Sequence, residues 1–206
     1  MSYCAWSRGN ALLEQYHDTE WGVPAKDDRV QFEYLMLEAM QCGLSWMLML
    51  KKREIFRHCF DGFDPKKVAR YTETDVERIL QTEGMIRSLH KIRAVIGNAV
   101  HFLEITEEYG SFWSYLCSFS GKQTILYDGH AEGNIPTSNA LSDRIAADLK
   151  KRGFRYLGSI TVYSHLQSCG IVNDHGKNCP CYARINAAFP TVRLPVCDEH
   201  GVICFA

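Results

Sequence analysis

The stretch that decides the fold spans residues 149–179 and reads LKKRGFRYLGSITVYSHLQSCGIVNDHGKNC. Apolar side chains recur at every fourth residue where the chain enters it, at Leu141, Ile145 and Leu149. This spacing predicts a helix with one apolar face. Gly153 is suited to end that helix, because glycine adopts the left-handed conformation without strain. Gly158 then precedes a second predicted helix, for which Ser159 is a suitable N-terminal cap.

Two helices joined by residues 152–158 form a candidate helix-hairpin-helix, which we place at about residues 140–170. In that arrangement the backbone N–H groups of the hairpin and of the second helix converge, and such donors bind a phosphate. Basic side chains surround the hairpin: Lys150, Lys151, Arg152 and Arg155. A phosphate contact of this kind positions nucleic acid without reading its sequence. A plain helix-turn-helix with a solvated charged face remains the alternative.

The composition indicates a globular protein. The chain has 206 residues, of which 46% are apolar, enough for one sizeable core. No run approaches the length of a membrane span, and the first ten residues lack the apolar core of a signal peptide. Nine cysteines favour buried thiols or metal ligands in a reducing compartment over disulfides. The net charge of −1 gives no general attraction to nucleic acid, so such contacts must come from local patches such as residues 51–53 and 150–152.

Helical periodicity extends along most of the chain. In addition to the helix after Gly158, we predict helices over residues 28–41, 46–57, 65–71, 73–83, 86–103, 112–119 and 139–149. Residues 122–136 have turn chemistry and are predicted to be a loop. Convincing strands are absent, so the predicted fold is all-α. We predict one domain over residues 1–183, followed by a tail of unknown role over residues 184–206 that is irregular or briefly extended.

Residues 34–50 read YLMLEAMQCGLSWMLML and contain a single charged residue, Glu38. Gly43 ends the first helix in this stretch and Ser45 caps the next, which brings Trp46 back near Glu38. An indole face and a carboxylate suit a flat cationic ligand, because one stacks on it and the other neutralises its charge. Burying a carboxylate without a partner is costly. A solvent-facing Glu38 and a Trp46 that serves only the core therefore remain the alternatives.

Cysteine and histidine residues near both ends of the chain are candidate metal ligands. The first set is Cys4, His17, His175 and Cys179. Four such ligands complete a tetrahedral zinc shell and leave no open position, which indicates a structural ion. A competing set lies toward the C-terminus: Cys181, Cys197, His200 and Cys204. Ordinary free thiols and surface histidines remain a third interpretation.

Three long segments follow one another along the chain: YHDTEWGVP (Tyr16–Pro24), LEAMQCGLSWMLMLKKRE (Leu37–Glu54) and IPTSNALSDRIAADLKKRGFRYLGSITVYSHLQSCGIVNDH (Ile135–His175). Together they resemble the DNA-3-methyladenine glycosylase I family, which belongs to the helix-hairpin-helix glycosylase superfamily. The resemblance extends from Cys4 to about Tyr182 without evident gaps.

This resemblance implies a monofunctional base-excision repair enzyme that hydrolyses the N-glycosidic bond of 3-methyladenine in alkylated DNA. It assigns catalysis and base recognition to Glu38. It assigns stacking on the base to Trp46 and Tyr16, and further pocket contacts to Trp6 and Ser164.

The resemblance also implies how DNA and metal are held. The Gly43-Leu44 turn would enter the gap left by the flipped nucleotide, with Leu44 as the apolar plug. Further DNA contacts fall on the hairpin, at Lys151, Gly153 and Gly158. A structural zinc falls on Cys4, His17, His175 and Cys179. No catalytic role falls on Asp174.

Two other functions are compatible with the residues. One is a non-enzymatic, zinc-stabilised DNA-binding module that uses the hairpin alone, and the other is a zinc hydrolase built on His17, Asp18 and Glu20. The expected partner is double-stranded DNA containing alkylated adenine. The protein is expected to act as a monomer in the bacterial cytoplasm or nucleoid, without contact with a membrane.

Overall fold

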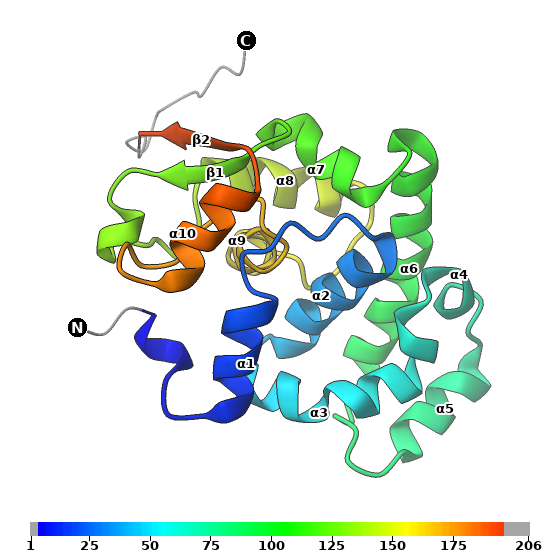
Figure 1. Cartoon of the computed structure of the whole chain (residues 1–206). Helices are drawn as coiled ribbons and strands as arrows, with labels where there is room; N and C mark the ends of the chain where they lie inside the picture. Colours follow the sequence, from blue (N-terminus) through cyan, green and yellow to red (C-terminus); the bar gives the residue numbers. More distant parts are fainter. Residues whose placement is uncertain (1–3, 196–206) are drawn as a thin grey trace.

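The computed structural model describes residues 4–195 and is mostly helical, with one pair of short strands (Figure 1). The α-helices are α1 (Ala11–Thr19), α2 (Asp28–Gln41), α3 (Trp46–Cys59), α4 (Pro65–Val68), α5 (Glu73–Gln81), α6 (Leu89–Tyr109), α7 (Phe112–Ser120), α8 (Ala140–Lys151), α9 (Ser159–Ser168) and α10 (Pro180–Ala188). The strands are β1 (Thr124–Tyr127) and β2 (Thr191–Leu194), and single 3₁₀ turns occupy Ala5–Ser7, Asp61–Phe63 and His130–Glu132. No helix among residues 4–195 is both long enough and apolar enough to cross a membrane.

Helix α2 lies at the centre of the molecule and is enclosed on nearly every side. All residues from 31 to 40 are buried, with α3, α6 and α9 packed around them. The Phe32 ring contacts Phe102 of α6 with centroids 5.1 Å apart, and Phe102 stacks on Phe112 of α7 at 4.5 Å. A helix enclosed in this way buries its polar residues together with its apolar ones.

Helix ends are set by local capping chemistry. As predicted, the Ser45 side chain accepts the Leu48 N–H and begins α3. Thr72 caps α5 through a capping box. The helix predicted from residue 139 begins one residue later, because the Asn139 side chain accepts the Ser142 N–H and caps α8.

The prediction of a mostly helical fold is confirmed, but the expectation that strands are absent is wrong. Strands β1 and β2 pair in parallel, with Thr124 opposite Thr191 and Tyr127 opposite Leu194. All four β1 residues are buried, so this strand has no alternation of apolar and polar residues. Its pairing partner lies far along the chain, where local patterns carry no information about it.

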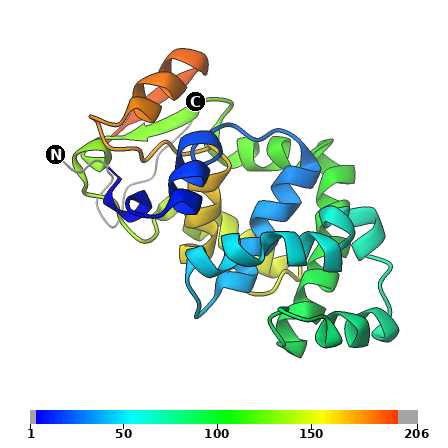
Figure 2. The same cartoon turned by 60° about the horizontal axis from the view of Figure 1, so that its bottom comes forward.

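The part of the predicted tail that the structure describes is ordered secondary structure. The predicted boundary between residues 183 and 184 falls within α10, and β2 follows it. Figures 1 and 2 show α10, β1 and β2 at one end of the molecule and α3, α4 and α5 at the other. Helices α1 and α9 lie between these two ends.

The N-terminal segment is joined to the end of α9 by backbone hydrogen bonds. The Gly22 N–H donates to the Gln167 carbonyl, and the Ala25 N–H donates to the Cys169 carbonyl, both at 3.0 Å. These two bonds hold residues 22–25, which lie between α1 and α2, against the end of α9.

The segment after α1 can approach the end of α9 this closely only because residue 170 is glycine. Its φ is +77°, and a Cβ there would overlap the backbone of Val23 and Pro24. We expect Gly170→Ala to lower the free energy of unfolding by about 2–4 kcal/mol. Gly97→Ala is the matched control, because nothing lies within 4 Å of its Cβ position in α6, and it should stabilise by roughly 0.5–1 kcal/mol. Urea unfolding of both variants measures the difference, and equal effects would contradict this packing.

Candidate active site

A cavity of about 300 Å³ opens between the N-terminal segment, α2, α3 and α9. This is within the size range of small-molecule sites in proteins. All five residues predicted for base recognition line it: Trp6, Tyr16, Glu38, Trp46 and Ser164. Four further lining residues were not predicted: Trp21, Gln41, Ile135 and Gln167. Gln41 lies three residues after Glu38, and Gln167 three residues after Ser164, so helical spacing alone could have found both.

Glu38 is the charged residue of this cavity. It is only 5% exposed, and no residue among 4–195 donates a hydrogen bond to its carboxyl group. Burial raises the pKa of Glu38 to about 8. The alternative of a solvent-facing Glu38 is therefore wrong, and the carboxyl group keeps its proton at neutral pH until a cation enters the cavity.

Aromatic rings form much of the cavity wall. The Tyr16 and Trp46 rings meet with centroids 5.3 Å apart, and Trp6 meets Trp21 edge-on at 5.0 Å. Trp46 packs against the core and lines the cavity, so it serves both predicted roles. Trp6 is 43% exposed, so its indole forms an open rim over the cavity.

A second hollow of about 200 Å³ adjoins the first one, and the two share Glu38, Gln41 and Ser164. The turn between α2 and α3 forms its outer wall, where Leu44 is 40% exposed. Lys91 of α6 fixes that turn, since its ammonium donates to the Met40 carbonyl at 2.7 Å and the Cys42 carbonyl at 2.6 Å.

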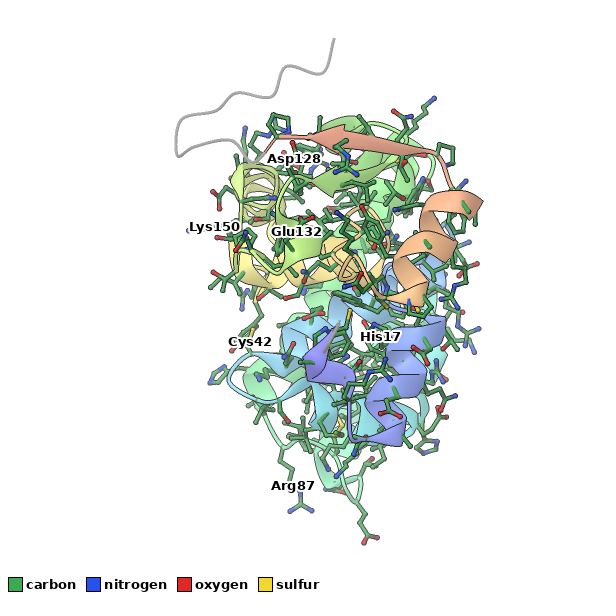
Figure 3. All side chains as sticks on the ribbon, turned by 60° about the vertical axis from the view of Figure 1, so that its left-hand side comes forward. His17, Cys42, Arg87, Asp128, Glu132 and Lys150 are labelled. Carbon is green, nitrogen blue, oxygen red and sulfur yellow. The ribbon has the colours of Figure 1, made fainter. Side chains whose placement is uncertain are left out.

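The predicted hairpin connects α8 to α9, with Gly153 at φ +100° and Gly158 in extended backbone. Asn98 of α6 holds it, because its amide accepts the Arg155 N–H at 2.9 Å and donates to the Arg155 carbonyl at 3.0 Å. Lys150 and Lys151 are exposed. Figure 3 places Lys150 on the same side of the molecule as Cys42.

One of the predicted hairpin cations is already paired. The Arg152 guanidinium donates to Asp148 at 2.7 Å and to Glu108 at 2.6 Å. It therefore has less capacity for a phosphate than the exposed lysines beside it.

The two ends of the chain meet at a cluster of candidate metal ligands: Cys4, His17, His175 and Cys179. One ligand atom of each lies within 4.8 Å of all the others. The Cys179 Sγ is 3.6 Å from both His17 Nε2 and His175 Nδ1, and the Cys4 Sγ is 3.7 Å from His175 Nδ1. Tetrahedral zinc places nitrogen and sulfur ligands roughly 3.5 Å apart, so these spacings fit the ion.

Neighbouring groups fix which ring nitrogens face each other. His17 Nδ1 is 2.7 Å from the Asp18 carboxylate and His175 Nε2 is 2.9 Å from the Trp21 carbonyl, so both of these nitrogens carry hydrogen. The inner nitrogens, His17 Nε2 and His175 Nδ1, are 3.0 Å apart and present two lone pairs to each other. A metal cation between them would remove this repulsion and bind both lone pairs.

The other proposed metal sets are not assembled in the same way. Cys181 lies near His17 and Asp18, whereas Cys197, His200 and Cys204 lie outside the described residues. Glu20, which the hydrolase interpretation required, is ion-paired with Arg53 at 2.7 Å.

Comparisons with known proteins agree with this geometry. The family model described as methyladenine glycosylase matches residues 6–182. A relative from Escherichia coli (strain K12), DNA-3-methyladenine glycosylase 1, is 45% identical over 182 residues, which are 88% of this chain and 97% of the relative.

Two solved structures are also similar. A crystal structure of 3-methyladenine DNA glycosylase I is 45% identical with a TM-score of 0.81, and the match covers 87% of this chain and 99% of that one. A variant of 3-methyladenine DNA glycosylase I in complex with 3-methyladenine is 32% identical with a TM-score of 0.82, over 87% and 97% of the two chains.

The fold, the cavity and these matches define the class of the protein, which is that of the DNA glycosylases. Within that class, the chain belongs to the methyladenine glycosylase family.

The buried Glu38 makes stability depend on pH in a defined direction. In the unfolded chain its pKa is the ordinary 4.5, whereas in the folded protein it is about 8. The contribution of Glu38 to stability is therefore fully present below pH 4.5, and it is lost as the pH rises through the folded-state pKa of about 8. Between roughly pH 4 and pH 9 we expect the protein to lose on the order of 4 kcal/mol of unfolding free energy relative to Glu38→Gln. Urea unfolding of both proteins across this range measures it, and parallel pH curves would contradict the buried, unpartnered carboxyl group.

Proposed function

We propose that this protein hydrolyses the N-glycosidic bond of 3-methyladenine in alkylated DNA, releasing the base and leaving an abasic site. The observation that carries the proposal is the unpartnered Glu38 carboxyl group in a cavity walled by Trp46 and Tyr16. The similar protein solved in complex with 3-methyladenine supports the choice of base.

The charge of the damaged base matches the site. A 3-methylated adenine is a cation in DNA, and its positive ring favours the Glu38 carboxylate and the electron-rich faces of Trp46 and Tyr16. When the bond to the sugar breaks, its electron pair moves to the base, which leaves neutral. Water adds to the sugar carbon and its proton goes to solvent. Since the leaving group needs no protonation, binding and orientation supply most of the required catalysis.

The proposed substrate is duplex DNA, from which the nucleotide must be flipped before it reaches the cavity. Exposed Leu44, on the turn beside the cavity, is placed to fill the gap in the stack. The hairpin at Gly153 and Gly158, together with exposed Lys151, is suited to the phosphate backbone. One chain contributes every wall of the cavity, so we expect a monomer to act.

A structural zinc on the four-residue cluster belongs to the same proposal. Cys4 and His17 come from the N-terminal segment, and His175 and Cys179 come from the segment between α9 and α10. The ion would supply a cross-link between these segments and, with four protein ligands, no open position for chemistry. The free cysteines of the described chain support a reducing compartment, such as the cytoplasm.

Release of bases from methylated duplex DNA tests the enzymatic proposal. We expect the protein to release 3-methyladenine, and we expect Glu38→Gln to lower kcat/KM about 100-fold because the cation loses its charge partner. The kcat/KM of the unsubstituted protein should rise with pH until the pH exceeds about 8, where free Glu38 is ionised. Glu83→Gln, which alters an exposed glutamate, is the matched control. A protein that releases no alkylated purine would contradict the proposal and would favour the alternative of a non-enzymatic DNA-binding module.

Metal removal tests the zinc proposal. We expect one zinc per chain by elemental analysis, and a fall in Tm of about 10 °C after chelation or in Cys179→Ser. Cys117→Ser alters a half-buried cysteine outside the cluster and should retain the metal. A metal-free protein with unchanged Tm after chelation would overturn this assignment.

A further inference from the structure

We propose that Gln167 selects the base by accepting a hydrogen bond from its exocyclic amino group, and that Asp174 orients the Gln167 amide for this purpose. The proposal deepens the proposed function and rests on it. It assigns Gln167 as a specificity-determining residue and Asp174 as a positioning residue behind it.

The orientation of the Gln167 amide follows from its partner. Gln167 Nε2 donates to Asp174 Oδ2 at 2.8 Å. The same carboxylate accepts the Tyr163 hydroxyl at 2.6 Å and lies 2.7 Å from His130 Nδ1. An ionised carboxylate can only accept hydrogen bonds, so an amide beside it must present its N–H groups rather than its oxygen. The opposite orientation would place the amide oxygen against a carboxylate oxygen.

The surrounding groups hold this arrangement rigidly. Asp174, Tyr163 and His130 are each at most 2% exposed, so their hydrogen bonds are made mainly within the protein. Leaving one such buried group without a partner costs about 1–3 kcal/mol. The amide of Gln167 is therefore fixed by chemistry that lies outside the cavity.

The oxygen end of the amide is the end left for a ligand. Gln167 lines the cavity together with Glu38, and no residue among 4–195 donates a hydrogen bond to Gln167 Oε1. The cavity thus presents an acceptor whose direction cannot be reversed without disrupting the Asp174 network.

A fixed acceptor discriminates between purines by the group at their six position. Adenine derivatives carry an amino group there, which donates, whereas guanine and hypoxanthine derivatives carry an oxygen, which would face Gln167 Oε1 with no hydrogen between them. Sites that hydrogen-bond a substrate N–H reject analogues lacking it by large factors. Glu38 would then select for positive charge, and Gln167 for the amino group.

Gln41 provides a matched control on the same cavity. Like Gln167 it is a glutamine in the cavity wall, but its amide has no hydrogen-bond partner among the described side chains and backbone. It is free to turn either end toward a ligand, so it cannot distinguish an amino group from an oxygen.

The test is a tryptophan-fluorescence titration with two free bases, 3-methyladenine and 3-methylhypoxanthine, which differ in the group at the six position. We expect the unsubstituted protein to prefer 3-methyladenine by about 100-fold, and Gln167→Met to lose at least about tenfold of that preference. Gln41→Met should weaken both bases and leave their ratio within about threefold. Asp174→Asn offers an N–H beside Gln167 and lets the amide turn, so it should also reduce the preference.

Each outcome decides one part of the inference. An unchanged preference in Gln167→Met overturns the role of Gln167. An unchanged preference in Asp174→Asn, with Tm and metal content preserved, overturns the positioning role of Asp174, and if this variant does not fold, Tyr163→Phe takes its place. Failure of the unsubstituted protein to bind 3-methyladenine or to release it from DNA would instead overturn the proposed function.

Discussion

The burial of one carboxyl group without a partner is the constraint on which the site depends. Helix α2 carries two buried acidic residues, of which one is ion-paired and the other is not. Glu33 is 6% exposed and is paired with Arg53 at 2.5 Å and Arg57 at 2.8 Å. Glu38, at 5% exposure, has no such partner among the described residues, although burial of this kind costs free energy. Since the chain neutralises one acid and leaves the other open to a cavity, the missing partner of Glu38 is best supplied by a ligand. The rest of the core must provide the stability that Glu38 removes.

Helix α6 holds the two loops that flank this cavity at a fixed separation. Lys91 and Asn98 are seven residues apart, close to two helical turns, so they share one face of the helix. Lys91 binds the carbonyls at the end of α2, whereas Asn98 binds the backbone of Arg155 in the hairpin. The Cys42 Sγ also lies 3.7 Å from the Tyr156 carbonyl and so joins the turn to the hairpin directly. In the proposed function the turn at Leu44 enters the base stack and the hairpin holds a backbone phosphate of the same duplex. These two loops would then need a fixed separation, which α6 can supply.

Local chemistry made part of this structure predictable from the sequence. The cap at Ser45 and the left-handed Gly153 follow from the side chain at one position, and both are confirmed. The lone charge of Glu38 in an apolar stretch pointed to the site, but spacing alone could not decide whether it is buried, because that depends on α3, α6 and α9 enclosing α2. Contacts between distant segments were not predictable in the same way. Three features can be known only once the tertiary arrangement is known. They are the β1–β2 pairing, the ion pair between Arg152 and Glu108, and the hydrogen bond from Gln167 to Asp174. The residue types alone left the ligand cluster as one of three interpretations, because its halves lie at opposite ends of the chain, and the family resemblance favoured it over the others.

Adjacent residues of α1 connect the metal-ligand cluster to the cavity. Side chains that follow one another on a helix point about 100° apart, so Tyr16 faces Trp46 in the cavity while His17 faces His175 in the cluster. Trp21 bridges the same two regions, since it lines the cavity and meets the His175 ring at 4.5 Å. A cross-link at the cluster would therefore fix the rotation of α1 and, with it, the aromatic wall of the cavity that Glu38 lines. Because α2 packs directly against α3, α6 and α9, we expect a weakened cluster to loosen the aromatic wall of the cavity before it loosens the core. A structural ion at the cluster would therefore act on recognition through geometry, without touching the ligand.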